Sequence, residues 1–210
     1  MSSIEKFESE LFAANIIDPD GVHSVFTSGL HGQKINFKQI PDGSELFDLW
    51  VTTTATYIDE NYPEAEVPEL FVASVDSGTN RLVGPVAEEL GCRASAHLTK
   101  KVRDGEIVLV PDAVDAIRVY SPDLVLFLDD AGTTGLTVST GVIHARAVGA
   151  RRTAVLYAIQ RSGTLPSLND INADYSAMIK REMPAYTAVE CAQAYFCAAG
   201  WDLRKRQEGA

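Results

Sequence analysis

Several features that would place this sequence in a common class are missing from it. Its 210 residues contain no apolar run close to the roughly 18 residues of a membrane-spanning helix, and the N-terminus lacks the basic-then-apolar pattern of a signal peptide. Lys and Arg (18) are outnumbered by Asp and Glu (29), which leaves no basic face for general nucleic-acid binding. We therefore expect a cytoplasmic protein without a membrane or nucleic-acid partner.

Cysteine is also scarce. The three cysteines, Cys92, Cys191 and Cys197, show no close metal-ligand spacing, and their odd number fits a reducing compartment. We expect all three to be small buried apolar side chains. The sequence also lacks a Walker A loop, a Rossmann glycine fingerprint, a nucleophile elbow and a zinc-binding spacing. The usual motifs of these nucleotide-binding, hydrolase and zinc-finger classes are thus absent.

The most informative segment is an apolar run followed by two acids. Residues 124–128 predict a strand buried on both faces, as in a parallel sheet, and Asp129 and Asp130 end it. A helical pattern begins near residue 136. Small and hydroxyl residues occupy the turn and the helix start, namely Ala131, Gly132, Thr133, Thr134, Gly135 and Thr137. Such a turn predicts an anion site, because the helix start offers backbone N–H groups and a favourable dipole.

The two acids restrict the kind of anion. Asp129 and Asp130 would repel a plain phosphate, but they suit a ligand that also carries vicinal hydroxyls, a developing positive charge or a bound Mg²⁺. A ribose 5-phosphate meets these needs, with its phosphate in the turn and its hydroxyls on the acids. The alternative is an ordinary strand-to-helix turn with a solvated pair of acids.

Residues 124–137 resemble the phosphoribosyl-pyrophosphate (PRPP) signature of the type I phosphoribosyltransferases, with two acids followed by a Thr-Thr-Gly turn. The resemblance implies an α/β fold with a mostly parallel central sheet flanked by helices and a small N-terminal hood. It implies that a nitrogenous base displaces pyrophosphate from PRPP, while Asp129 and Asp130 stabilise the oxocarbenium-like ribose. Mg²⁺ would bind through PRPP, with Asp129 as a candidate protein ligand, and a homodimer is expected by analogy.

A second strand, turn and helix are predicted over residues 70–91. The turn resembles the pyrophosphate loop of the same family, although Thr79 stands where a second glycine is common. The expected PRPP contacts here are Asp76, Ser77, Gly78, Thr79 and Arg81. For Arg81 the alternative is an exposed helix side chain.

Three further features resemble orotate phosphoribosyltransferases in particular. Residues 26–34 resemble a hairpin beside the base pocket, and Arg161 follows a strand at 152–159, where an Arg would face the orotate carboxylate. The expected base-binding residues are Phe26, His31, Lys34 and Arg161. A basic loop resembles the family's mobile loop, and its Lys100, Lys101 and Arg103 would stabilise the departing pyrophosphate. The alternatives are two plain surface hairpins and an ion pair between Arg161 and the acid pair.

The expected domain organisation is a hood at 1–42, a PRPP-binding core at 43–164 and a C-terminal helical extension at 165–210 packed on the core. Helices are predicted over residues 3–16, 43–62 and 187–199, the first and the last with a capping box, and a further helix within 168–183. Three functions stay open at this point: an orotate phosphoribosyltransferase, an enzyme for another base, and a non-catalytic PRPP-sensing regulator on the same fold.

Overall fold

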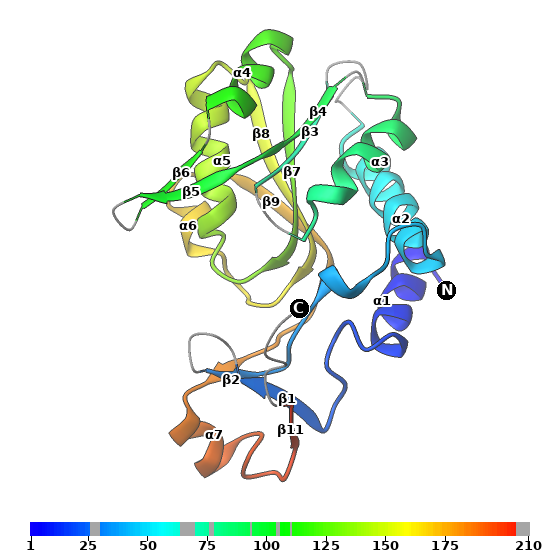
Figure 1. Ribbon diagram of the computed structural model, residues 1–210, viewed down its shortest axis with the longest axis vertical. Coiled ribbons are helices and arrows are strands. Elements are labelled where there is room, and N and C mark those ends of the chain that lie inside the picture. Colours follow the sequence, from blue (N-terminus) through cyan, green and yellow to red (C-terminus); the bar gives the residue numbers. More distant parts are fainter. Residues whose placement is uncertain are drawn as a thin grey trace.

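The computed structural model describes residues 1–25, 30–63, 70–75, 78–92, 94–103, 106–109 and 111–204 (Figure 1). Within these ranges, the side chains of residues 100–103, 106–109, 111–113 and 204 are outside the description. Three of the predicted site residues, Phe26, Asp76 and Ser77, also lie outside the described residues. The rest of the chain forms a large sheet covered by helices on both faces and a smaller sheet below it (Figure 1).

The large sheet is entirely parallel. Its strands are β3 (Leu70–Val75), β4 (Ala94–Leu98), β7 (Leu124–Gly132), β8 (Arg152–Gln160) and β9 (Asp174–Lys180), in the order β4-β3-β7-β8-β9. The carboxyl ends of all five strands therefore meet at one edge of the sheet. This arrangement confirms the predicted α/β class and the predicted strands at 70–75 and 124–128.

Alternating side chains of these strands enter two separate cores. Leu126 and Leu156 belong to the core under α1 (Ser3–Ala13), α2 (Glu45–Asn61) and α3 (Asn80–Leu90). Phe127 and Val155, their neighbours in sequence, belong to the core under α4 (Pro111–Tyr120), α5 (Leu136–Ala147) and α6 (Pro166–Asn169). The helices lie on opposite faces of the sheet accordingly (Figure 1). Strands buried on both faces need apolar side chains at every position, which explains the unbroken apolar runs.

The helix starts follow the capping signals in the sequence. Ser2 and Glu5 form a capping box at α1, and the hydroxyl of Ser44 accepts a hydrogen bond from the backbone N–H of Phe47 at the start of α2. A second capping box, Thr187 with Glu190, opens α7 (Ala188–Ala194). The prediction that this last helix runs to residue 199 is wrong, because the helix ends after Ala194.

The smaller sheet combines segments from the N-terminal and C-terminal parts of the chain. Its strands are β1 (Val22–Val25), β2 (His31–Gly32), β10 (Ala185–Tyr186) and β11 (Asp202–Arg204), in the order β10-β2-β1-β11. The predicted helical extension at 165–210 instead supplies β9 to the large sheet and β10, α7 and β11 to this unit. The prediction of a helix within 168–183 is wrong, because α6 (Pro166–Asn169) ends at residue 169 and β9 occupies Asp174–Lys180.

Two shorter elements complete the described chain. The basic segment forms an antiparallel hairpin of β5 (Lys100–Arg103) and β6 (Glu106–Leu109), and η1 (Phe37–Gln39) connects β2 to α2. Among the described residues, no helix combines the length and apolarity that crossing a membrane requires.

Candidate active site

Three loops meet where β3, β7 and β8 end, because these strands are neighbours and parallel. The first loop contains Gly78 and Thr79, the second contains residues 131–135, and the third contains residues 161–163. The carboxyl edge of a parallel sheet is the usual place for ligands in α/β proteins. The structure therefore brings together the predicted acid pair, the predicted anion turn and Arg161.

The acid pair lies at the end of β7, with both side chains half-buried. Asp129 Oδ1 accepts a hydrogen bond from the backbone N–H of Asp130 (3.0 Å), and Asp130 Oδ1 accepts one from Ala131 (2.9 Å). Burial raises the pKa of Asp130, although the N–H groups of Ala131 and Gly78 and the charge of Lys38 oppose this rise. The Asp130 carboxylate is thus partly desolvated and is held by backbone N–H groups.

Gly78 is required by the acid pair. A Cβ at this position would overlap the carboxylate of Asp130. Thr79, where a second glycine was expected, is buried, and its hydroxyl donates a hydrogen bond to the carbonyl oxygen of Leu128 (2.9 Å). The departure from the family pattern therefore has a structural cause, because Thr79 fastens the start of α3 to β7.

The anion turn begins α5 without a side-chain cap. Gly135 adopts the left-handed region (φ +77°), and the backbone N–H of Leu136 donates to Thr134 Oγ1 (3.4 Å). Thr133 and Thr134 are exposed. The first turn of a helix has backbone N–H groups without partners inside the helix. Hydroxyls and N–H groups of the turn are therefore available to one anion.

The floor of this turn is Tyr157 of β8, which the sequence analysis missed. Its side chain is fully buried, and a Cβ at Gly132 would lie 3.1 Å from its ring. A Cβ at Gly135 would lie 2.8 Å from Leu168 and 3.4 Å from the Tyr157 hydroxyl. That hydroxyl has no hydrogen-bond partner among the described residues. Both glycines of the turn are thus required by what lies under them, and the strand around Tyr157 carries no sequence signal for this role.

Arg161 continues from β8 into a pocket of about 550 Å³. Its Nη2 donates to the carbonyl oxygens of Gln33 (3.0 Å) and Met183 (3.4 Å), and burial lowers the pKa of its guanidinium. The pocket is lined by Leu30, Thr133, Arg161, Ser162, Gly163, Glu182, Met183, Pro184 and Ala185. Ser162 Oγ donates to the carbonyl oxygen of Thr133 (2.9 Å), so the third loop is tied to the anion turn.

The other predicted residues that the structure describes have contacts of their own. The Arg81 guanidinium donates to Asp42 (2.5 Å) and to the carbonyl oxygen of Phe37 (2.9 Å). Lys34 is exposed, and its backbone N–H donates to Asp18 (2.8 Å). Nδ1 of His31 lies 3.5 Å from the sulfur of Cys197. Lys100, Lys101 and Arg103 are on β5, where the backbone alone is described.

Comparison with solved structures identifies the architecture. An orotate phosphoribosyltransferase from Aeropyrum pernix superposes with a TM-score of 0.61 at 16% identity, over 82% of this chain and 92% of that one. An adenine phosphoribosyltransferase gives a TM-score of 0.63 at 15% identity, over 84% of this chain and 99% of that one. The adenine enzyme from Saccharomyces cerevisiae gives 0.61 at 18%, over 83% and 99%. This chain has the type I phosphoribosyltransferase fold.

Two comparisons based on the sequence itself find no match. No protein-family model matches it, and no curated protein matches it. The type I phosphoribosyltransferase fold predicted from residues 124–137 is nevertheless confirmed by the superpositions. Three residues beside these loops belong to no sequence motif and could not be predicted: Tyr157, Lys38 and Glu182.

Proposed function

We propose that this protein is a phosphoribosyltransferase that transfers the 5-phosphoribosyl group of PRPP to orotate, releasing pyrophosphate and orotidine 5′-monophosphate. The proposal rests on the position of three features next to one another. The acid pair of β7 is followed directly by the anion turn, and Thr133 of that turn lines the same pocket as Arg161. Phosphate, ribose and base can thus be bound side by side along one edge of the sheet.

The 5-phosphate would bind in the turn over residues 131–137. Backbone N–H groups at the start of α5 and the hydroxyls of Thr133, Thr134 and Thr137 are donors suited to phosphate oxygens. A fixed phosphate orients the sugar ring, and holding reactants in place removes much of the entropic part of the barrier.

The ribose would then lie over Asp129 and Asp130. Their carboxylates accept hydrogen bonds from the 2- and 3-hydroxyls, and they stabilise positive charge as the C1–O bond to pyrophosphate breaks. The electron pair of that bond leaves with pyrophosphate. The base nitrogen forms the new bond to C1 and gives up its proton. The partly desolvated setting of Asp130 strengthens its interaction with the developing cation.

The pyrophosphate needs cations, and Mg²⁺ would supply part of the charge. Among the described residues no third carboxylate joins Asp129 and Asp130 in a metal-binding group, so the ion would be held mainly by PRPP oxygens with Asp129 as the candidate protein ligand. Backbone at Gly78 and Thr79 borders the same space, with Asp76 and Ser77 beside them in sequence. Lys100, Lys101 and Arg103 would approach from the β5–β6 hairpin.

The base would enter the pocket that Arg161 lines. A guanidinium beside an otherwise largely apolar wall suits a planar ring that carries a carboxylate, and this favours orotate. Glu182 lines the same pocket and favours the second candidate, a base with an exocyclic amino group such as adenine. Lys34 and Phe26 stay predictions for base binding. We do not propose a base-binding role for His31, because its Nδ1 faces the sulfur of Cys197.

One assay tests the proposal and separates its alternatives. Protein, Mg²⁺ and PRPP are mixed with single bases, and nucleotide and pyrophosphate are both measured. Product with orotate alone supports the first candidate, and product with adenine alone supports the second. PRPP binding by calorimetry without product from any base would overturn the enzymatic proposal and leave a PRPP-binding regulator.

We also propose that the protein acts as a homodimer in the cytoplasm. Val119, Tyr120 and Ile143 are large apolar side chains exposed on α4 and α5, which favours contact with a second copy. Sedimentation velocity at several protein concentrations measures the oligomeric state, and a monomer at all concentrations would contradict the proposal.

A further inference from the structure

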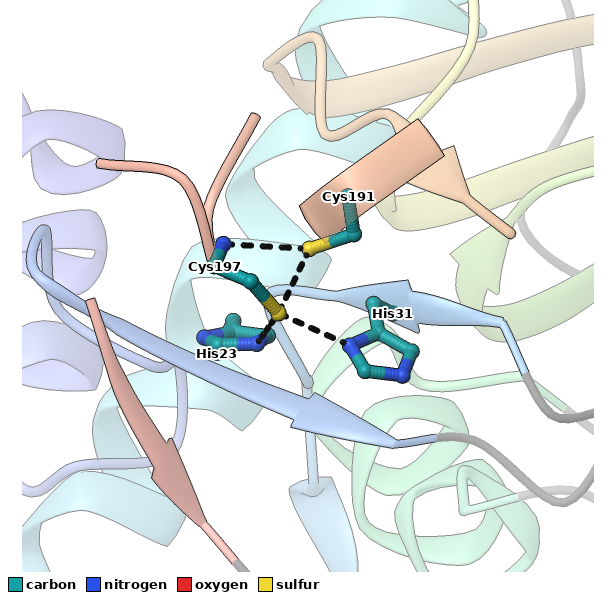
Figure 2. A group of neighbouring side chains, drawn as sticks. All are labelled: His23, His31, Cys191 and Cys197. Atoms are coloured by element: carbon teal, nitrogen blue, oxygen red, sulfur yellow. Dashed lines mark hydrogen bonds between the residues drawn. The ribbon is translucent and has the colours of Figure 1, made fainter. Parts of the chain in front are cut away.

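Two histidines and two cysteines from opposite ends of the chain converge beside the smaller sheet (Figure 2). His23 is on β1, His31 on β2, Cys191 on α7, and Cys197 follows α7. One ligand atom from each of the four side chains lies within 4.8 Å of the other three. In the part of the chain that the structure describes, no other His, Cys, Asp and Glu side chains converge in this way.

The distances suit a tetrahedral metal centre. Cys197 Sγ lies 3.3 Å from His23 Nε2, 3.5 Å from His31 Nδ1 and 3.1 Å from Cys191 Sγ. Zinc bonds to sulfur and imidazole nitrogen would place a sulfur and a nitrogen about 3.6 Å apart and two sulfurs about 3.8 Å apart. The sulfur–nitrogen separations are close to these values, and the two sulfurs need to separate by less than about 1 Å.

The part of the molecule around the cluster has few buried side chains. We call β1, β2 and residues 185–204 the small-sheet unit. Its described side chains are exposed or half-buried except those of His23, Ser24 and Cys191. Folded units with little apolar interior are commonly stabilised by a metal or by disulfides. Two of these three buried side chains, His23 and Cys191, belong to the cluster, and partly exposed aromatic rings pack beside it, with Phe196 stacked on His23.

Hydrogen bonds alone do not explain why these four side chains lie together. Sulfur is a poor donor and a poor acceptor, so it satisfies a buried imidazole badly. The imidazole of His23 is buried, and its Nε2 faces the sulfur of Cys197 (3.3 Å). The backbone N–H of Cys197 donates to Cys191 Sγ (3.2 Å), so the segment after α7 holds the two sulfurs next to each other.

We propose that His23, His31, Cys191 and Cys197 bind one Zn²⁺ in a closed four-coordinate site. All four positions are filled by protein, which is typical of a structural site and leaves no position for a catalytic water. The metal would fasten the hairpin of β1 and β2 to the C-terminal segment. Leu30 and Ala185, which line the pocket of Arg161, belong to the two fastened segments. The proposal does not depend on the enzymatic function.

The expectation that all cysteines are buried apolar side chains needs correction here. Cys197 is half-buried and faces two imidazoles, and Cys191 contacts Cys197. Cys92 packs against the core under α2 and α3, and burial raises the pKa of its thiol to about 11. A local zinc spacing is absent from the sequence because the histidine pair and the cysteine pair are far apart; Cys197 is 166 residues from His31.

Metal content of the full chain tests the proposal. Protein is purified under reducing conditions and dialysed against metal-free buffer. Inductively coupled plasma mass spectrometry should then find about one Zn²⁺ per chain. His31→Ala should lose most of this zinc, whereas Cys92→Ser, the matched cysteine control, should keep it. His31→Cys should also keep it, because a thiolate replaces the imidazole as a ligand.

A second measurement covers variants that fold poorly. Wild-type protein stripped by a chelator and loaded with Co²⁺ should show the visible d–d bands of tetrahedral cobalt and a thiolate-to-metal charge-transfer band, and the latter should intensify in His31→Cys. Three results would overturn the proposal: no zinc in wild-type protein with no uptake of added Zn²⁺, zinc retained in full by His31→Ala, or a Cys191–Cys197 disulfide found by peptide mapping in place of bound metal.

Discussion

The guanidinium group of Arg161 donates a hydrogen bond of 3.0 Å to the backbone carbonyl of Gln33. The two residues are 128 positions apart, so this bond connects the end of β8 to the segment that follows β2. The same guanidinium lines the pocket beside Thr133. One side chain therefore both ties the smaller sheet to the large sheet and supplies a cation to the proposed base site.

Arg161→Lys separates these two roles, because it keeps the charge and loses the planar fork. If the fork binds the carboxylate of orotate, kcat/KM for orotate should fall about 10- to 100-fold, as expected for losing a charged hydrogen bond. The KM for PRPP should change little. Steady-state kinetics with each substrate varied measures both, and Arg181→Lys on the neighbouring surface is the control. A lower thermal stability with an unchanged KM for orotate would make Arg161 only a structural tether.

Asp130→Asn tests the stabilisation of the ribose cation. Asparagine keeps the size of the side chain and removes its charge, so kcat should fall at least about a hundredfold, as for other groups that stabilise transition-state charge. PRPP affinity should fall much less, because the turn over residues 131–137 is unchanged. Single-turnover kinetics and calorimetry measure the two quantities, with the exposed Asp115→Asn as control. Unchanged kcat would remove Asp130 from the mechanism.

The raised pKa of Asp130 has a consequence for stability. Burial raises it above 3.8, its ordinary value, and a carboxyl group that binds its proton more tightly in the folded state favours folding at low pH. This contribution is complete below the unfolded pKa and is lost as pH rises through the folded pKa. The free energy of unfolding of the wild type, relative to Asp130→Asn, should therefore decrease as pH rises through that range. Urea denaturation at a series of pH values measures it, and parallel curves for the two proteins would be the contrary result.

The parts of this fold that sequence reasoning predicted are those set by local patterns. The unbroken apolar run at 124–128 implies burial on both faces, and Ser2 with Glu5 implies a capped helix start; both are found. Residues 34–37, which follow the predicted hairpin segment, do not belong to a strand, and the reason is tertiary. The backbone N–H of Lys34 donates to the carboxylate of Asp18, and the backbone N–H of Asp18 donates to the carbonyl oxygen of Lys34. Ile35 forms an isolated bridge with Ile17, so this segment pairs with residues 17–18 and does not lengthen β2.

The parts that were missed depend on contacts between distant segments. β11 exists because Asp202 pairs with Val22, and nothing near residue 202 in sequence indicates such a partner. Tyr157 reads as one more apolar residue of a buried strand, and its place under the anion turn follows from the register of β7 and β8. Sequence spacing likewise predicts local metal sites well and assembled ones poorly.

Gly135→Ala tests how tightly the anion turn is packed. Gly91→Ala is a matched control, since Gly91 has a similar φ (+69° against +77°) and nothing within 4 Å of an added Cβ. Both variants pay the left-handed strain of about 1–2 kcal/mol. Gly135→Ala should lose more stability, because its Cβ would press on Leu168, and it should also weaken PRPP binding. Denaturation and calorimetry measure these effects. Equal losses of stability with intact PRPP binding in both variants would contradict the packing described for the turn.

Removal of the proposed zinc should loosen the small-sheet unit while leaving the large sheet folded. Two of the three buried side chains of that unit, His23 and Cys191, are proposed ligands, whereas the large sheet has two apolar cores that contain no ligand. Limited proteolysis of chelator-treated protein should therefore cut within residues 185–204 about tenfold faster or more than in zinc-loaded protein, since bound metal stabilises only the folded form. Added Zn²⁺ should restore protection in the wild type and in Cys92→Ser, and not in His31→Ala. Equal cleavage rates with and without metal would show that the β1–β11 and β2–β10 pairings hold the unit together without it.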